Sequence, residues 1–434
     1  MLVINLLQRA IGFARNFALC YFLAETQLGL WGLASSFFVL AAPLAVLGLP
    51  GTFGRFVESY RGRGQLMRFL TFCMSIAIAG YIILSVCLIC FHSASGLAIF
   101  GDSQSRWDMA LIASALGCII LFNAATELTS GLRQPKAVSS MHAVNSMAFT
   151  VLSLLGLWWI RDWRVLVVAF GVSALLGLLP VIPIIRHPSL WVRKIGSDLS
   201  VAEIARRVLP FAVSVWVINL VLNSFDIVDR YLLLHLASND GSAEMGQALV
   251  GQLHSGKLIP TLLANLAVML GGIVLPYLVV DWEQGRIERV VSSMRTNIKL
   301  GTLFFFGLSL GAMVASPFLF GWVLRGRYAD GLAILPMALV ACCWMAVATF
   351  LNNYFWCAER GRLLGVLTTA ALLLNAALCV WLIPSMGLHG ALMANVIATG
   401  FLVAITAWTL ERLEITLGWP TYFIASVPIV LAFG

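Results

Sequence analysis

The arginines of the first predicted helix carry the clearest chemistry in the sequence. Asn5, Arg9, Gly12 and Asn16 lie at i, i+4, i+7 and i+11 of one apolar run, so they share a helical face. If that run crosses a membrane, a polar face must meet protein or water rather than lipid. The planar donor fork of a guanidinium suits a phosphate group. We therefore expect this face to form part of a phosphate-accepting cavity wall.

Arg9 and Arg15 are expected at different depths in the membrane, so we interpret them differently. Arg9 is near enough to the expected inner end of its helix to reach lipid headgroups with its long side chain. A cavity role and a headgroup role for Arg9 both stay open. Arg15 lies deeper, which favours the cavity.

A second set of charges lies within the seventh and eighth predicted helices. Asp226, Asp229 and Arg230 share one face, and Asp226 with Arg230 is an i, i+4 pair of opposite sign. One arginine cannot neutralise two carboxylates, so one acid is left to protonate or to pair with the neighbouring helix. Lys257, about 16 Å along that helix, is the nearest candidate in depth. An internal ion pair and a functional role remain alternatives, and the cost of a lone membrane lysine favours function.

Histidines and cysteines give no sign of a metal or redox site. His142, His235 and His254 lie within predicted helices without metal spacing, which favours interhelical hydrogen bonds over a proton relay. All nine cysteines lie in apolar segments, where cysteine behaves as a small hydrophobe. Cys87 and Cys90 have no second pair with which to bind zinc. We predict no metal and no cofactor.

The composition places these residues in a membrane. Of the 434 residues, 61% are apolar and 11% are charged, less than half the charged share of a soluble chain. The composition excludes a water-soluble globular enzyme. The net charge of +8 sits in short clusters between apolar runs of about 20 residues. Such clusters indicate membrane orientation rather than nucleic-acid binding.

Twelve apolar runs are long enough to cross a bilayer. They are 2–24, 28–50, 67–91, 107–131, 137–160, 164–185, 208–236, 247–279, 299–324, 331–357, 363–383 and 388–410. A thirteenth run begins at Pro420, and its 15 residues are too short for a roughly 30 Å core. We expect from this that the chain lacks its native C-terminus.

The basic residues orient the predicted helices. With the N-terminus in the cytoplasm, 18 of the 27 Lys and Arg residues fall in inner connections and five in outer ones. The outer connections are short, the longest being about 92–106. A membrane glycosyl-transfer enzyme would need loops there to hold its catalytic carboxylates, so this class is disfavoured.

The predicted domains are two six-helix bundles, 1–185 and 208–410. A cytoplasmic interfacial linker, 186–207, joins them, and a partial thirteenth helix occupies 411–434. A weak parallel repeat supports the two bundles. Asn123 and Asn352 lie near the inner ends of the fourth and tenth helices, and each is followed by a basic turn and an apolar helix with one asparagine.

Five segments in order along nearly the whole chain carry a family resemblance. The chain resembles the flippases of the multidrug, oligosaccharidyl-lipid and polysaccharide exporter superfamily, and most closely the polysaccharide-biosynthesis (O-antigen type) flippases. The segments are Arg9–Arg15, Leu28–Ala34, Gly48–Pro50 followed by Arg55–Gly64, Asp226–Leu232 and Leu382–Ala391.

The resemblance implies a non-enzymatic, alternating-access transporter with a central cavity between two bundles. Its implied substrate is an undecaprenyl-diphosphate-linked oligosaccharide, flipped to the outer leaflet of a bacterial inner membrane for cell-surface polysaccharide. Implied partners are membrane lipids and the proteins that polymerise the glycan and set its chain length, with no nucleic acid. A lipid II-type flippase and a multidrug antiporter are the alternatives. Asn16 stands where the lipid II group commonly has an acidic residue.

The site residues assigned under this resemblance form two groups. The coupling residues are Asp226 and Asp229. The cavity residues that bind substrate are Arg9, Arg15, Asn16, Asn123, Arg230, Lys257 and Asn352.

Overall fold

The computed structural model describes residues 2–187, 200–225, 227–237 and 242–433. Over these ranges the chain is helical and contains no strand. Ten of the described helices are long and apolar enough to cross a membrane, so this is a multi-pass membrane protein. The predicted all-α polytopic fold class is confirmed. The helices form two compact units, Met1–Ser224 and Phe225–Gly434, which are described in turn.

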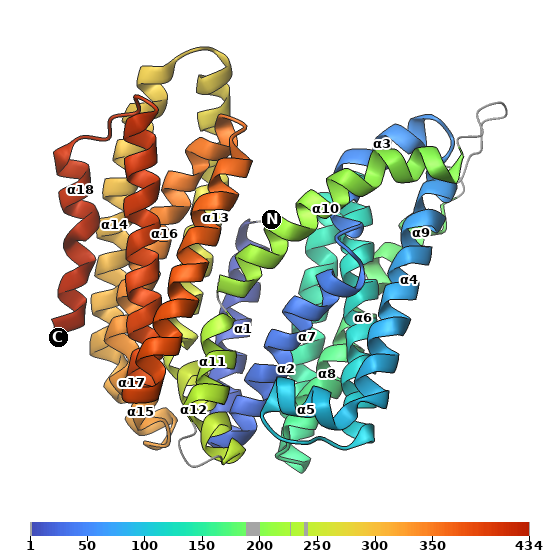
Figure 1. The fold of residues 1–434 in the computed structure, drawn as a ribbon, viewed down its shortest axis with the longest axis horizontal. Coiled ribbons are helices and arrows are strands. Elements are labelled where there is room, and N and C mark those ends of the chain that lie inside the picture. Colours follow the sequence, from blue (N-terminus) through green and yellow to red (C-terminus); the bar gives the residue numbers. More distant parts are fainter. Residues whose placement is uncertain (1, 188–199, 226, 238–241, 434) are drawn as a thin grey trace. The chain divides into compact units, whose positions relative to one another are not determined.

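The first unit contains the first six predicted membrane runs, as α1, α2, α4, α6, α7 and α8 (Figure 1). Its elements are α1 (Leu2–Phe22), α2 (Glu25–Ala45), η1 (Pro50–Thr52), α3 (Phe53–Gly62), α4 (Leu66–Cys90), α5 (His92–Phe100), α6 (Arg106–Gly131), α7 (Pro135–Trp159), α8 (Trp163–Leu176), η2 (Leu179–Val181), α9 (Ile182–Ile185) and α10 (Val201–Phe225).

Helix α3 occupies a basic connection where the sequence predicts no helix. Phe53, Phe56, Val57 and Tyr60 repeat at i, i+3, i+4 and i+7, and all four are buried. Together they form the apolar face of a short amphipathic helix. This face packs against Phe69 of α4 and the beginning of α10 in one apolar cluster. A search for apolar runs does not find such a helix, because the basic residues on its exposed face lower the mean hydropathy of the segment.

Helix α10 begins with a capping box and packs closely on the α2–α3 connection. Ser200 Oγ accepts from the Glu203 amide at 3.2 Å, and Glu203 Oε2 accepts from the Ser200 amide at 2.7 Å. Gly48 has a φ of +67°, and a Cβ there would lie 2.8 Å from Cβ of Trp216. Glycine is therefore required where α10 crosses this turn.

The division between the units differs from the predicted one. The sequence places 208–224 in the second bundle, whereas these residues belong to the first unit. The reason is the apolar packing of Val208 and Ala212 against α3 and α4. Most of the predicted linker 186–207 lies outside the described residues, so its interfacial location stays a prediction.

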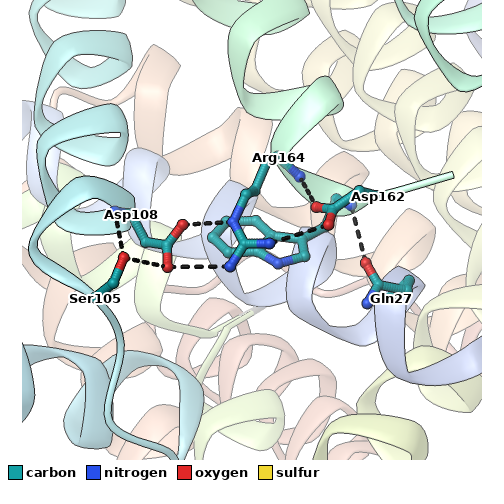
Figure 2. A network of polar contacts seen from close by, with 6 residues as sticks. Gln27, Ser105, Asp108, Asp162 and Arg164 are labelled. Atoms are coloured by element: carbon teal, nitrogen blue, oxygen red, sulfur yellow. Dashed lines mark hydrogen bonds and ion pairs between the residues drawn. The ribbon is translucent and has the colours of Figure 1, made fainter. Parts of the chain in front are cut away.

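A polar network ties three helices of the first unit together (Figure 2). Arg164, in the first turn of α8, forms ion pairs with Asp108 of α6 and with Asp162. The Asp108 amide donates to Ser105 Oγ at 3.2 Å, which caps α6. The backbone amide next to Arg164, that of Trp163, donates to Gln27 Oε1 of α2 at 3.0 Å. This network fixes one end of the bundle.

The second unit contains the remaining predicted runs except 208–224, several of them divided differently (Figure 1). Its elements are α11 (Val228–Leu236), α12 (Ala243–Gly256), α13 (Leu258–Glu283), α14 (Ile287–Phe318), η4 (Leu319–Val323), α15 (Ala329–Ala333), α16 (Leu335–Cys357), α17 (Gly361–Arg412), α18 (Trp419–Ser426) and η5 (Val427–Phe433).

Three boundaries in this part of the chain depart from the apolar runs. The run 208–236 is divided into α10 and α11, and the run 247–279 is divided at Lys257 into α12 and α13. Helix α14 begins twelve residues before its predicted start at 299. The predicted break between 383 and 388 is present inside α17, where Gly387 has a φ of 53° and a ψ of −124°.

Candidate functional site

Arg15 lies against α7 in the first unit. Its guanidinium stacks over the Phe149 ring at 4.4 Å from the centroid, and Nη1 donates to Thr150 Oγ1 at 3.5 Å. The side chain is half-buried, and its Nε has no hydrogen-bond partner among the described residues. An aromatic face holds a cation without neutralising it. Arg15 therefore keeps its positive charge and spare donors for an anion.

The other predicted residues of the first unit differ in exposure. Arg9 and Asn16 are half-buried on α1, as expected for a helix with one polar face. Gln8, beside Arg9, donates to the backbone carbonyl of His142 at 3.2 Å and attaches α1 to α7. Asn123 is exposed on the surface of α6.

Lys257 and Asp229 form a buried ion pair in the second unit. Lys257 Nζ contacts Asp229 Oδ2, and the two side chains are 15% and 0% exposed. Lys257 occupies the junction at which α12 ends and α13 begins, and Asp229 lies in the first turn of α11. The neighbouring-helix partner that sequence depth predicts for an aspartate is therefore found. The carboxylate neutralises the lysine, which favours the ion-pair interpretation over a free cation.

Several polar atoms around this pair lack hydrogen bonds. Asp229 Oδ1, both ring nitrogens of His254 and Nδ2 of Asn375 are buried without a hydrogen-bond partner among the described residues. Cys379 lies one helical turn from Asn375 on α17, and its Sγ contacts Asn375 Oδ1 at 3.8 Å. Buried polar groups without partners are rare in proteins and indicate a functional or alternating contact.

Sequence reasoning predicted Lys257 as a partner for one aspartate, without choosing between Asp226 and Asp229, and it missed the surroundings of the pair. Asn375 was noted only as a repeat position, and Cys379 only as an apolar residue. The sequence signal that could have identified Asn375 and Cys379 as neighbours is their i, i+4 spacing, which places both on one helical face within an apolar run. Thr150 and Phe149, which hold Arg15, had no such signal.

The remaining predicted residues lie near the pair in sequence or elsewhere in the second unit. Arg230 is half-buried on α11. Asn352 is half-buried on α16, and its Oδ1 has no hydrogen-bond partner among the described residues. Asp226 lies outside the described residues. Because Arg15 and Lys257 belong to different units, their common cavity stays a prediction.

A groove of about 430 Å³ between α7 and α8 contains none of the predicted site residues. It is lined mainly by aliphatic side chains, with Asp162 and Arg164 at one end. Among the described residues, no group of three His, Cys, Asp or Glu side chains could hold a metal ion.

In comparisons of sequence, no family model and no curated protein matches the chain. Comparisons of structure do. The structure of "Lipid II flippase MurJ, inward closed conformation" matches with a TM-score of 0.73 at 13% identity, over 99% of this chain and 91% of that one. The fold is that of these membrane transporters.

Two further solved structures extend the likeness. An inward-facing multidrug resistance transporter of the MATE family and MOP superfamily matches with a TM-score of 0.67 at 14% identity, over 94% of this chain and 96% of that one. A MATE transporter in complex with MaL6 matches with a TM-score of 0.62 at 13% identity, over 94% and 95%. The transporter fold thus extends over nearly the whole chain.

Proposed function

We propose that this chain is an alternating-access transporter that flips a polyprenyl-diphosphate-linked oligosaccharide from the cytoplasmic to the outer leaflet. The observation that supports this most is its likeness over 99% of its length to a lipid II flippase, whose cargo is a lipid. A flippase has to move charged headgroups through a layer that cannot solvate them. The polyprenyl tail can stay in the bilayer, so only the headgroup needs a protein path.

Arg15 supplies the chemistry for the headgroup. Its charge is held over Phe149 and is not paired with a carboxylate in any described contact. A guanidinium can donate two parallel hydrogen bonds to a phosphate. In this proposal Arg15 binds the diphosphate, and Arg9 and Asn16 extend the same polar face of α1.

The Lys257–Asp229 pair has a different role in this proposal. The pair is a coupling element rather than a direct diphosphate ligand, because the carboxylate of Asp229 already compensates the positive charge of Lys257. Opening the pair would release a cation and a carboxylate together. The unpartnered atoms of His254 and Asn375 lie in the same unit and offer new partners to the released groups.

The biological setting follows the same proposal. The transporter would act in cell-surface polysaccharide synthesis in a bacterial inner membrane, with its N-terminus in the cytoplasm. A lipid II-type cargo remains an alternative because of the first structural match. A multidrug antiporter is the second candidate, favoured by the MATE structures.

Ligand binding to the purified full chain distinguishes these candidates. Native mass spectrometry in detergent would compare a polyprenyl-diphosphate oligosaccharide, the polyprenyl monophosphate and the cationic dye ethidium. We expect the diphosphate to bind most tightly. Arg15→Gln should weaken its binding about tenfold, because a hydrogen bond to a charged group is lost.

Arg161→Gln is the matched control, since Arg161 is an exposed arginine of the same unit. It should bind the diphosphate as the unaltered chain does. Tight ethidium binding without diphosphate binding would support the multidrug antiporter and contradict the flippase proposal. Equal binding of diphosphate by Arg15→Gln and Arg161→Gln would remove Arg15 from the site.

A further inference from the structure

Six arginines surround one end of the first unit and define what we call the basic surface. All are exposed, and they come from three elements: α3 with the residue after it, the first turns of α4, and the first turns of α10. They are Arg55, Arg61, Arg63, Arg68, Arg206 and Arg207. Figure 1 shows α3 beside the beginning of α10 at this end.

An apolar cluster beneath the basic surface fixes its shape. Phe56 and Tyr60 of α3 pack with Phe69 of α4 and Ile204 of α10, and each of the four is 5% exposed or less. The Tyr60 and Phe69 rings stack with their centroids 4.7 Å apart. Because the three backbones are held together, the arginines converge on one rigid platform rather than on separate loops.

Aromatic rings position two of these arginines without neutralising them. The Arg55 guanidinium lies 4.7 Å from the Phe211 ring centroid and 5.6 Å from that of Phe56. The Arg207 guanidinium lies 5.7 Å from the Phe56 ring centroid. A cation on an aromatic face keeps its N–H donors directed outward. The two guanidiniums are therefore ordered and still able to bind oxygen anions.

Described acidic residues offset only part of this charge. Glu58 pairs with Arg61 at 3.4 Å, and both side chains are about 40% exposed. Glu203 accepts from the Ser200 amide within the capping box of α10. Among the described residues, two carboxylates against six arginines leave the basic surface with a net positive charge.

The position of the basic surface limits its ligand. Helices α4 and α10 are candidate membrane spans, and the six arginines lie in their first turns or in α3 and the residue after it, just before α4. The arginines therefore lie at the depth of lipid headgroups. We propose that the basic surface is a binding site for the phosphates of anionic phospholipids, independent of the transported cargo.

Lipid binding to the delipidated full chain tests this proposal. The probes are phosphatidylglycerol and phosphatidylcholine of equal chain length, followed by native mass spectrometry and thermal melting. Each arginine near an anionic surface contributes about fivefold to affinity. The unaltered chain should prefer phosphatidylglycerol at least about tenfold, and Arg55→Gln with Arg207→Gln should remove most of that preference.

Two matched double variants separate a site from general charge loss and from misfolding. Arg63→Gln with Arg206→Gln changes exposed arginines for which no aromatic contact is described, and it should also reduce the preference. Arg289→Gln with Arg362→Gln removes the same charge from exposed positions of the second unit and should retain it. Equal losses in all three variants, or no phosphatidylglycerol preference in the unaltered chain, would overturn the proposal.

Inorganic diphosphate provides the remaining arm of the experiment. A soluble anion should stabilise the protein much less than phosphatidylglycerol at equal concentration, because it lacks the acyl chains that hold the headgroup at this depth. Equal stabilisation by diphosphate would identify a soluble anion as the ligand and overturn the lipid assignment.

Discussion

At the scale of single residues, two membrane cations in this chain are compensated in different ways. The charge of Lys257 is compensated by a fully buried carboxylate, that of Asp229. Arg15 instead relies on an aromatic face and one threonine hydroxyl. The first arrangement joins two helices through an ion pair, and the charge of the lysine is then no longer available to a ligand. The second keeps the charge available, which is why the proposed diphosphate contact is assigned to Arg15.

Lys257→Met should destabilise the protein through its partner. The substitution leaves a buried, unpaired carboxylate, which costs about 3–5 kcal/mol. Adding Asp229→Asn should recover most of the loss, because the amide carries no charge to compensate. Melting of the purified variants in detergent measures both effects.

Lys136→Met is the control for that comparison, since Lys136 is exposed at the beginning of α7. It should melt with the unaltered chain. A Lys257→Met protein that melts normally yet does not flip its cargo would instead return Lys257 to the substrate site.

The sequence predicted these charged residues better than it predicted their contacts. Counting residues along α12 and α13 brought Lys257 to the depth of the aspartates, because helical rise is fixed. It could not choose between Asp226 and Asp229, which differ by less than one turn. The contact between Arg15 and Phe149 depends on how α1 packs against α7, and no local pattern encodes that.

At the scale of elements, hydrophobicity predicted where helices exist but not all of their ends. Apolar runs gave the spans of α4, α6 and α7 to within about two residues, since a bilayer requires internally bonded helices of fixed length. The division at Lys257 lies inside an apolar run, between Gly256 and Pro260, and the span prediction, which followed hydrophobicity alone, passed over this glycine and proline. Helix α3 was missed because it is only 10 residues long, so its 3.6-residue apolar period repeats few times, and because its exposed face is basic.

Gly48→Ala should disrupt the packing of α10 on the first unit. A Cβ in the left-handed region costs about 1–2 kcal/mol, and here it would also meet the Trp216 Cβ at 2.8 Å. We expect a clear fall in melting temperature and faster amide exchange in 212–216. Gly54→Ala is the matched control, because a Cβ on Gly54 meets nothing within 4 Å. Replacing a helical glycine there should be neutral or slightly stabilising. Equal melting of the two variants would contradict this packing account.

At the scale of the whole molecule, the distribution of charge along the helical fold predicts how the chain is oriented across the membrane. The chain divides into two compact units, and the apolar packing of α10 places 208–224 in the first of them, which composition does not reveal. By the positive-inside rule, the excess of arginine in connections such as 55–68 predicts that these segments lie in the cytoplasm. In that orientation the basic surface would face the leaflet where the proposed cargo is made.

Single cysteines introduced into a cysteine-free background test this orientation. A membrane-impermeant maleimide added to whole cells should label Ser103→Cys, in the connection after α5, and should leave Ser59→Cys on α3 unlabelled. Permeabilised cells should show labelling at both positions. Labelling of Ser59→Cys from outside would overturn the orientation and the direction of transport.

Translocation in proteoliposomes tests the central claim most directly. The full chain is reconstituted with a fluorescent polyprenyl-diphosphate oligosaccharide, and an impermeant quencher reports how much of it reaches the outside. We predict rapid exposure of inner-leaflet cargo, loss of that exposure in Arg15→Gln and its retention in Arg161→Gln. Exposure no faster than in protein-free liposomes, or unchanged exposure with a well-folded Arg15→Gln protein, would contradict the account.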